Sequence, residues 1–499
     1  MKTPSVYTTM LAVCLLAACS SNDDGDQAAA NYSRVDCMEL SGQEVFAAGL
    51  LGDDTVECGL VTVPADWSVE NGDTIKLAIY RIFATSANPA PDPLVYLEGG
   101  PGGSGAPIIS EFVSGSAAYL RERSDVIVID QRGTGYSRPA LFCPEVFRAD
   151  AEDGDVVAAY QACHDRLVGE GVRFADYNSA YNAQDVNAVR QALGFAEWNL
   201  YGLSYGTRLA LTVMRDVPEG VRSVVLDSVF PPEINGLSET PYVSYWTIEQ
   251  IASNCAADAD CSANIGDIKA LIEDGIARLD AAPVGDISAS FYVQALAELM
   301  TDSRLVTIVS TVASGTDTEI LTLAQEVEAS LDDDDAPSPN EVPAALYPFV
   351  AESDGMGYAV ICGEEVPYLE YTAGPEIAAN FRESTQRVID AMDHPFDGSL
   401  CDIYTVPARG EIETQPVMSR IPTLVLAGTA DVATPPAWSM LTDDALANSQ
   451  YAEFDGLAHG LLGNNECLNQ ITLAFLNDPG STADQACIVD LPRVDYVTE

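Results

Sequence analysis

The chain is 499 residues long, which suffices for one elaborated domain or for two. It carries 76 acidic against 23 basic residues and a formal net charge of −53 at pH 7, so its surface repels phosphates and excludes electrostatic binding of nucleic acids. The acids are spread along the chain, which indicates a solvated surface suited either to a salty exterior or to an acidic compositional habit.

The N-terminus has the pattern of a targeting signal. A basic start and an apolar run over 6–16, too short for a membrane span, are followed by small residues. Leu16-Ala17-Ala18-Cys19 resembles a bacterial lipobox. This implies a signal peptide over 1–18, a lipid on Cys19 and, in the Gram-negative pattern, an exported lipoprotein of the outer membrane facing the periplasm or the cell surface. Residues 19–36 would then be a flexible tether; the alternative is a soluble secreted protein with an incidental Cys19.

Short apolar segments alternate with helical patterns through the first half of the chain. This alternation predicts an α/β fold with a mostly parallel sheet and helices on both faces. Expected strands cover 57–64, 74–83, 94–97, 125–129, 197–201 and 223–226, and expected helices cover 181–193 and 207–215.

After Pro231-Pro232 the pattern becomes helical and later returns to strands. Expected helices cover 243–257, 268–279, 291–300, 319–331 and 375–392, and expected strands cover 423–427 and 450–454. We therefore expect a core made of 37–232 and 411–499, interrupted by a helical insertion over 233–410.

The cysteines predict disulfides. Of the twelve, Cys14 and Cys19 belong to the signal, and an even number then remains in an exported chain. Other connectivities stay open, but the most local pairing is Cys37–Cys58, Cys143–Cys163, Cys255–Cys261, Cys362–Cys401 and Cys467–Cys487. The chain has no Cys-x-x-Cys and its three histidines are scattered, so we expect no zinc site and no other metal or cofactor.

Gly202-Leu203-Ser204-Tyr205-Gly206 lies at the corner between an expected strand and an expected helix. In a nucleophile elbow of this Gly-x-Ser-x-Gly type, the serine takes a strained backbone conformation, and small flanking residues let the strand and the helix approach. The hydroxyl is then presented at the carboxyl end of a sheet. We therefore predict Ser204 as the nucleophile of a serine hydrolase.

The histidine and the acid follow from chain order, which in this architecture is nucleophile, acid, histidine. His164 precedes the serine and His394 lies in the helical insertion, so His459, after the last expected strand, is the predicted base. Asp431, in the exit loop of an expected strand, would bond and orient its ring. Asp227, at the exit of another strand, is the rival acid. The alternative is that Asp431 caps a turn and His459 is an ordinary loop histidine.

An acyl-transfer site also needs N–H donors for the oxyanion that develops on the scissile carbonyl. One is expected at Tyr205, immediately after the nucleophile. The other is expected at Gly100 in a Gly-rich loop, since the next residue, Pro101, has no N–H. Such a loop could instead cradle a phosphate. It has no Gly-Lys-Ser/Thr ending and the chain is acidic, and both facts disfavour that role.

Four motifs stand together in the expected core: Glu98-Gly99-Gly100-Pro101-Gly102-Gly103-Ser104-Gly105, Asp130-Gln131-Arg132-Gly133-Thr134-Gly135-Tyr136-Ser137, Gly202-Leu203-Ser204-Tyr205-Gly206, and 424–435 with Ala458-His459-Gly460. They resemble the proline iminopeptidase and tripeptidyl aminopeptidase family, over a stretch from about Cys58 to the C-terminus. The closing segment around Cys467 and Cys487 is similar to the C-terminal module of the secreted tripeptidyl aminopeptidase branch.

The resemblance implies an α/β-hydrolase fold with a large helical cap. It also implies a metal-free serine exopeptidase that cuts one or a few residues from a free peptide N-terminus. Proline iminopeptidases usually have His where this chain has Glu98, which together with the cysteines favours the tripeptidyl type. A carboxylate must hold the substrate's ammonium group, and Glu364 and Glu365 are the candidates, with Glu98 as another.

The expected partners are peptide substrates with a free N-terminus. We expect no nucleic-acid partner, and membrane contact only through the lipid anchor. The same catalytic machinery would serve a carboxylesterase, which is the alternative activity. A further alternative is a catalytically silent, surface-anchored α/β-hydrolase that acts as a binding protein.

Overall fold

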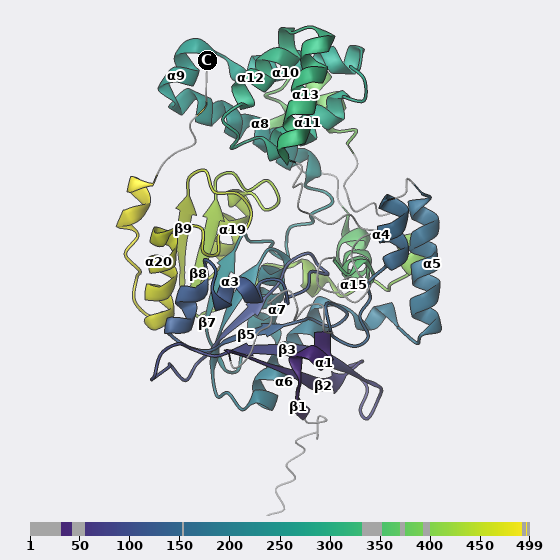
Figure 1. Cartoon of the computed structure of the whole chain (residues 1–499), viewed down its shortest axis with the longest axis vertical. Helices are drawn as coiled ribbons and strands as arrows, with labels where there is room; N and C mark the ends of the chain where they lie inside the picture. The colour runs from purple at the N-terminus through teal and green to yellow at the C-terminus, as the bar shows by residue number, and fades with distance from the viewer. Residues whose placement is uncertain are drawn as a thin grey trace, which may run out of the picture.

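The computed structural model describes residues 31–41, 55–151, 154–331, 352–369, 375–392, 400–491 and 496. Within them a nine-stranded sheet has the order β1-β2-β3-β5-β4-β6-β7-β8-β9 (Figure 1). Its strands are β1 (Asn31–Val35), β2 (Val56–Pro64), β3 (Thr74–Ile82), β4 (Leu94–Leu97), β5 (Val126–Ile129), β6 (Trp198–Leu203), β7 (Val221–Asp227), β8 (Thr423–Gly428) and β9 (Ser449–Phe454). β1, β2, β3 and β5 pair antiparallel in turn, and all pairs from β5 to β9 are parallel. The predicted mostly parallel sheet is confirmed.

Every strand expected from the sequence is present, with ends that differ by at most two residues. β1 is an addition, because it lies in the predicted tether over 19–36. Asn31 pairs with Thr62 and Val35 with Cys58 along β2. The tether prediction is therefore wrong for 31–35, since edge pairing depends on the open hydrogen-bonding groups of β2 and not on a local pattern. The predicted signal peptide and Cys19 lie outside the described residues.

The central strands are buried on both faces, as their continuous apolar runs predict. In β4, Leu94 and Tyr96 belong to one apolar core, and Val95 and Leu97 belong to the other. Helices α3 (Ile109–Val113) and α20 (Glu466–Asn477) pack on the first core, and α6 (Ser179–Leu193) and α7 (Tyr205–Asp216) pack on the second. The sheet is thus the middle layer of three.

The parallel strands bring functional loops to one edge of the sheet. β4, β6, β7 and β8 are consecutive neighbours that run in the same direction, so their carboxyl ends lie side by side. Gly100 follows β4, Ser204 follows β6, Asp227 ends β7 and Asp431 follows β8. Four candidate groups far apart in the sequence therefore leave the sheet at one edge.

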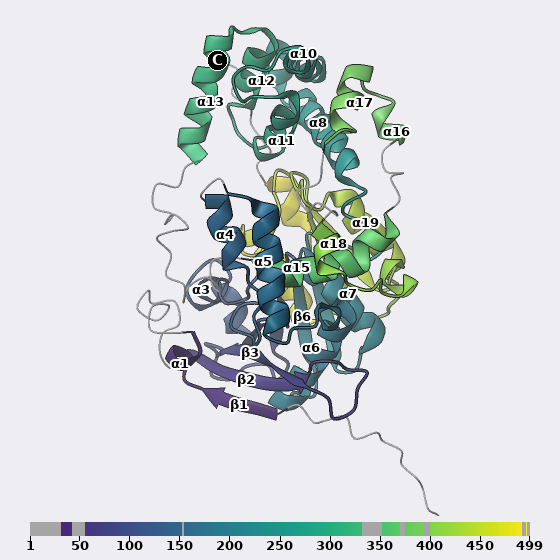
Figure 2. The same cartoon turned by 90° about the vertical axis from the view of Figure 1, so that its right-hand side faces the viewer.

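A group of helices that we call the helical cap packs as a separate unit at the top of Figures 1 and 2. Its members are α8 (Thr240–Ala257), α9 (Ala259–Asn264), α10 (Ile268–Ala281), α11 (Ala289–Glu298), α12 (Leu305–Ser314), α13 (Asp317–Leu331), α16 (Pro375–Ala378) and α17 (Glu383–Ile389). Its apolar core also includes two buried residues from the C-terminal part of the chain: Ala430, beside Asp431, and Tyr496. The Tyr496 side chain is 1% exposed, and its hydroxyl donates to the Met300 carbonyl at 2.9 Å.

The expected helix over 375–392 is broken into α16 and α17, and that prediction is corrected. The Gln386 side chain donates to the carbonyl oxygens of Ala378 and Phe381, at 3.0 and 2.8 Å. These bonds satisfy carbonyls that a continuous helix would have paired through its backbone. The Arg382 N–H, at the break, donates to the Glu273 carboxylate of α10 at 2.7 Å, so a tertiary contact also stabilises the break.

Segment 352–369 packs beside the nucleophile helix, although it falls within the predicted insertion. It contains α15 (Asp354–Val360) and the π-helix η4 (Ile361–Glu365). Met356 and Tyr358 share an apolar cluster with Tyr205 at the start of α7. The remaining α-helices of the described residues are α1 (Cys37–Ser41), α4 (Pro144–Ala151), α5 (Val156–Gly169), α18 (Cys401–Tyr404) and α19 (Pro436–Ala445).

The five disulfides of the structure are Cys37–Cys58, Cys143–Cys163, Cys255–Cys261, Cys362–Cys401 and Cys467–Cys487. They are the most local pairing, so that prediction is confirmed. Within the described ranges, none of the helices combines the length and the apolar character that a membrane span requires.

Candidate active site

Ser204 occupies a strained corner between β6 and α7. Its φ of 56° and ψ of −124° are unusual for a residue with a side chain, and its N–H donates to the Asp227 carbonyl at 3.0 Å. A Cβ atom on Gly206 would clash with the Leu97 carbonyl, and one on Gly202 would clash with the Gly206 carbonyl. The two glycines are therefore required for the close approach of strand and helix, as a nucleophile elbow demands.

The His459 ring is held by Asp431. Its Nδ1 lies 3.0 Å from Oδ1 and 3.1 Å from Oδ2 of this carboxylate, which is completely buried. Asp431 also accepts from the N–H groups of Ala433 and Thr434, at 3.0 and 2.8 Å, and from the Thr434 hydroxyl at 2.8 Å. Because an ionised carboxylate only accepts, Nδ1 is the donor, and the neutral ring keeps Nε2 as its basic nitrogen.

Asp227, the rival acid, has a different task in the structure. Its buried carboxylate accepts the Tyr201 hydroxyl at 2.7 Å and the backbone N–H groups of Leu461 and Leu462 at 3.0 Å. Both N–H groups belong to the loop that follows His459. The two strand-end carboxylates thus divide the work: Asp431 bonds the imidazole, and Asp227 bonds the backbone that carries it.

The charges around His459 favour its protonated form. Burial by itself lowers the pKa of His459, but the hydrogen bond and the charge of Asp431 raise it, and the charges of Asp227 and Glu98 add to this, so that the net shift is upward. An imidazole with a raised pKa accepts a proton more readily, which suits the His459 ring to the predicted role of general base.

The two predicted oxyanion donors are Tyr205, which follows Ser204 in the chain, and Gly100, which lines the same cavity as Ser204. Tyr205 is the first residue of α7, and its side chain is buried with its hydroxyl 2.9 Å from Ser179 Oγ. Gly100 lies in the left-handed region, with φ of 109°, and lines the same cavity as Ser204. The neighbouring Gly99 N–H donates to the Glu98 carboxylate at 2.8 Å, which fixes the Gly-rich loop.

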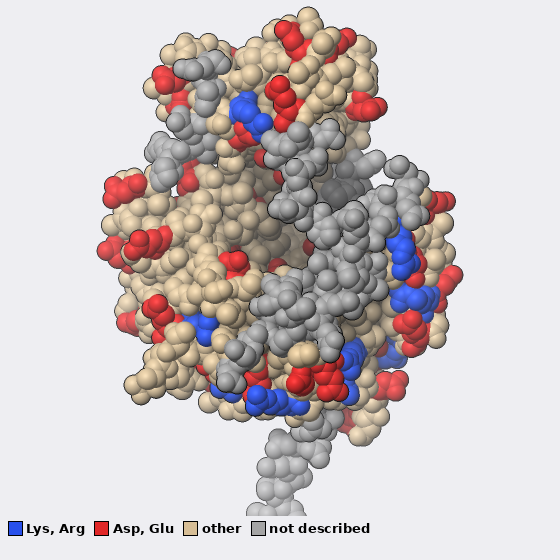
Figure 3. Space-filling model, viewed as in Figure 1, with Lys and Arg blue, Asp and Glu red and all other residues tan. Residues whose placement is uncertain are grey.

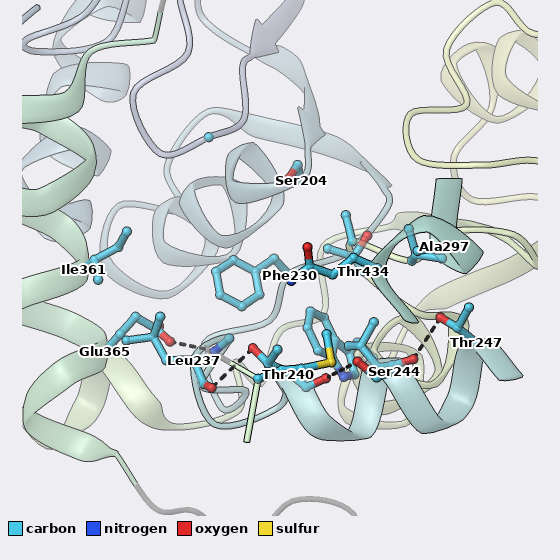
Figure 4. Close-up of a pocket in the computed structure, with 18 of the residues that line it drawn as sticks. Ser204, Phe230, Leu237, Thr240, Ser244, Thr247, Ala297, Ile361, Glu365 and Thr434 are labelled. Atoms are coloured by element: carbon cyan, nitrogen blue, oxygen red, sulfur yellow. Dashed lines mark hydrogen bonds between the residues drawn. The ribbon is translucent and has the colours of Figure 1, made fainter. Parts of the chain in front are cut away.

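A cavity of about 680 Å³ opens in front of Ser204, between the core and the cap. Figure 4 shows Ser204 and Phe230 over it, with Ile361 and Glu365 on one side and Thr434 and Ala297 on the other. The cap contributes residues of α8 and α11 to its wall, and Figure 3 shows the molecular surface hollowed between cap and core. The Phe230 ring lies against the Trp438 ring, with centroids 5.8 Å apart, and both side chains line the cavity.

The three carboxylates predicted to hold an ammonium group lie in different places. Glu365 lines the cavity, but it forms a buried ion pair with Arg208 of the nucleophile helix. Glu364 lines a second cavity of about 460 Å³ and accepts the Ser179 N–H and hydroxyl, both at 2.7 Å. Burial, with the nearby Glu413 charge, raises the pKa of Glu364 to about 7.

Glu98, the third of them, directly precedes the glycines of the Gly-rich loop. Besides the Gly99 N–H, its carboxylate accepts the Tyr96 hydroxyl at 3.1 Å. Burial raises the pKa of Glu98 even though these hydrogen bonds oppose the shift. Its partners make Glu98 a support of the loop.

The sequence did not predict Arg208, which contacts several segments that border the site. Its guanidinium bonds Glu365, donates to the Pro231 and Ile234 carbonyls at 3.0 and 2.7 Å, and stacks over the Phe230 ring at 3.9 Å. It lies one helical turn after Ser204, and that spacing is the only sequence signal it gives. Its partners are far away in the chain, so the contacts themselves were not predictable.

No three His, Cys, Asp or Glu side chains are grouped so as to hold a metal ion in the part of the chain that the structure describes.

Comparisons with known proteins support the fold. Residues 92–263 match the family model described as alpha/beta hydrolase fold, and residues 391–487 match the one described as TAP-like protein. Tripeptidyl aminopeptidase of Streptomyces coelicolor is 30% identical over 264 residues, 46% of this chain and 47% of that protein. In Mycobacterium tuberculosis, serine protease Hip1 is 29% identical (43% of this chain, 44% of that protein) and carboxylesterase B is 28% identical (48% and 45%).

The chain is an α/β-hydrolase with a TAP-like C-terminal segment, and its elbow serine places it with the serine hydrolases. It is distantly homologous, at about 30% identity, to the tripeptidyl aminopeptidases and to Hip1. The chain spans about half the length of the relatives it matches. Its five disulfides indicate an exported protein.

Proposed function

We propose that the protein is a serine aminopeptidase, which releases short peptides of two or three residues, or single residues, from free peptide N-termini. The observation that carries this proposal is the hydrogen-bonded pair of Asp431 and His459 beside the cavity that Ser204 lines. Thr434 shows how near this pair is, because it lines the same cavity and its hydroxyl oxygen lies 3.2 Å from His459 Nδ1. The names of the relatives, tripeptidyl aminopeptidase and serine protease, support peptides as the substrate class.

The proposed chemistry follows from the named groups. His459 Nε2 takes the Ser204 proton while Oγ attacks the scissile carbonyl carbon, and Asp431 stabilises the resulting imidazolium. The N–H groups of Gly100 and Tyr205 hold the oxyanion. His459 then gives its proton to the leaving amine, the C–N bond breaks, and an acyl ester remains on Ser204. Water, deprotonated by His459, hydrolyses that ester and restores the serine.

The position of the cavity between cap and core supports cleavage near a chain end. The cap borders the space in front of Ser204 with α8 and α11, so a short N-terminal segment fits into it more readily than the middle of a folded chain. The aromatic pair of Phe230 and Trp438 offers an apolar surface to one substrate side chain.

The test compares substrates that differ only at the N-terminus or at the bond to be cut. The full-length protein is assayed with Ala-Ala-Pro and single-Pro chromogenic amides, with their N-acetylated forms, and with p-nitrophenyl esters. We expect amide hydrolysis that is lost on N-acetylation and absent in Ser204→Ala. Cleavage of esters alone would contradict the proposal.

A carboxylesterase is the second candidate, because the relative named carboxylesterase B is 28% identical and the same triad serves both reactions. Ester cleavage without amide cleavage would establish it. A catalytically silent binding protein is the third candidate, and equal turnover by wild type and Ser204→Ala would favour it.

We also propose that the chain is a lipoprotein anchored through Cys19. The lipobox pattern supports this, and mass spectrometry of the mature N-terminus tests it. A diacylated Cys19 is expected, whereas an unmodified, soluble N-terminus would contradict the anchor.

A further inference from the structure

The loop that follows β5 holds the Gly-rich loop over 98–105 at both of its ends. At one end, the buried Asp130 carboxylate accepts the Gly105 N–H at 2.8 Å. At the other end, the Gln131 side chain donates through Nε2 to the Glu98 carbonyl at 2.8 Å. The first two side chains of the Asp-Gln-Arg-Gly-Thr-Gly-Tyr-Ser motif therefore frame the loop that supplies a predicted oxyanion donor.

The Gly-rich loop depends on such supports, because its glycines have no side chains that could fix it. The Gly99 N–H donates to the Glu98 carboxylate and the Glu98 carbonyl accepts the Gln131 amide, so both ends of this peptide group are held. The next peptide group joins Gly99 to Gly100, and its carbonyl accepts the Gly103 N–H at 3.2 Å. Since the N–H of a trans peptide points away from its carbonyl, these contacts set the direction of the Gly100 N–H.

The Gln131 amide is in turn oriented by Asn182 of α6. The Asn182 Nδ2 donates to Gln131 Oε1 at 3.0 Å, and the two side chains are only 1% and 2% exposed. The oxygen of the Gln131 amide therefore faces Asn182, which leaves its NH₂ group for the Glu98 carbonyl. Without Gln131, buried polar groups on both sides of it would lose a partner.

Asn182 also connects this support to Tyr205, the second predicted donor. The Tyr205 hydroxyl lies 2.9 Å from Ser179 Oγ. Burial, with the Glu364 charge, raises the pKa of Tyr205, and hydrogen bonds with the Ser179 and Asn182 side chains oppose that shift. A buried network thus runs from the Gly-rich loop through Gln131 and Asn182 to the residue expected to supply the other N–H.

We propose that Gln131 is a positioning residue for the oxyanion hole and that Asn182 orients it. The Gln131 amide fixes the peptide groups that aim the Gly100 N–H at the developing oxyanion. A displaced N–H stabilises the transition state less, although the substrate itself binds as before. This inference rests on the proposed acyl-enzyme chemistry. It applies to amide and ester substrates alike, because both pass through a tetrahedral oxyanion.

The experiment measures kcat and KM per active site for wild type, Gln131→Met, Asn182→Ala and Asn199→Ala. The substrate is Ala-Ala-Pro-p-nitroanilide or, if wild type cleaves only esters, p-nitrophenyl acetate. Titration with a fluorophosphonate counts the reactive serines in each preparation, and thermal unfolding gives Tm. Asn199 is the matched control: its fully buried amide bonds Asp92 and Ser223, and it lies at the amino end of β6, away from the site.

For Gln131→Met we expect kcat per active site to fall about 10- to 100-fold with KM nearly unchanged, because only the transition state uses the displaced N–H. Asn182→Ala should show a smaller loss of the same kind, since Gln131 keeps its reach but not its fixed orientation. Asn199→Ala should lower Tm and leave kcat per active site as in wild type. Neither network variant should move the acidic limb of the pH profile, because no charge near His459 changes.

A purely structural role would give a different result. Gln131→Met would then have fewer reactive serines or a lower Tm but wild-type kcat per active site, and that outcome would overturn the inference. An equal fall of kcat in Asn199→Ala, or a loss that lies in KM alone, would also overturn it. If Gln131→Met does not fold, Asn182→Ala decides by the same criteria. A wild type that is not labelled and cleaves neither substrate would instead contradict the proposed function itself.

Discussion

The α/β core and the helical cap hold their polar side chains in different ways. Around Ser204, the core carboxylates are buried, and each accepts several hydrogen bonds: Asp431 from His459 and Thr434, and Asp227 from Tyr201 and a loop backbone. The cap presents helix faces to the same cavity, and its carboxylate there, Glu298, is exposed. The cap is held by apolar packing, which includes Ala430 and Tyr496.

In the proposed function, this difference assigns catalysis to the core and substrate selection to the cap. Groups that move protons must be fixed within tenths of an ångström, and the hydrogen bonds at the strand ends provide that precision. A cavity wall that binds varied peptides needs an accessible surface and a charged side chain, and helices packed on an apolar core can provide both. Substitutions in the core are therefore expected to change kcat, and substitutions in the cap to change KM and local stability.

Asp431→Asn is the core variant with the largest expected effect. The neutral amide cannot stabilise the imidazolium, and its NH₂ group can donate to Nδ1 and favour the wrong tautomer of the ring, so kcat is expected to fall by about 10⁴-fold while the fold persists. Steady-state kinetics and circular dichroism measure both. Asp227→Asn is the matched control, for which we expect a smaller loss of kcat together with a lower Tm, because it loosens the loop after His459. If Asp227→Asn were the more damaging to kcat, the division of roles between the two acids would be wrong.

Tyr496→Ala probes the cap. Removing this buried ring leaves a cavity among the cap helices and is expected to destabilise the cap by about 3 kcal/mol. Hydrogen exchange should show faster exchange of α8 and α10 amides and unchanged exchange in β6 and β7. Tyr496→Phe keeps the ring and loses only the bond to Met300, at a cost of about 1 kcal/mol. Equal acceleration in cap and core would show that the two regions unfold as one.

Glu364→Gln tests whether this buried carboxylate makes the free energy of unfolding depend on pH. The pKa of Glu364 rises from 4.5 to about 7, so the folded chain binds more protons than the unfolded chain within that window. The free energy of unfolding therefore falls as pH rises from 4.5 to 7, by at most about 1.4 kcal/mol per pH unit. Denaturant titrations at several pH values should show that slope in wild type and a flatter one in the variant. A slope that is the same in both would assign it to other groups.

Glu98→Gln is expected to have the smallest effect. The Glu98 charge contributes to the raised pKa of His459, and glutamine can still accept the Gly99 N–H. Since His459 must be neutral to act as a base, the acidic limb of the pH profile of kcat/KM should move to lower pH, by about a few tenths of a unit. A shift toward higher pH would show that the carboxylate does not act through its charge.

Much of the core could be predicted from the sequence, because its signals are local. Continuous apolar runs predict the strands. Strand-end placement and chain order predict Ser204, Asp431 and His459 as the site residues, and in the structure a hydrogen bond joins Asp431 to His459. The cap and the pocket wall depend on tertiary packing. Arg208 and Glu365 are 157 residues apart, and no local sequence pattern around either residue predicts their ion pair. β1 and the break between α16 and α17 were missed for the same reason.

The central claim, that Ser204 is an activated nucleophile, is tested most directly by covalent labelling. The folded, full-length protein is treated with a fluorophosphonate probe, digested, and analysed by mass spectrometry. We predict a single adduct on the peptide that contains Ser204, absent in Ser204→Ala and formed much more slowly in Asp431→Asn. A folded wild-type protein that stays unlabelled, or that carries the adduct on another serine, would contradict the account.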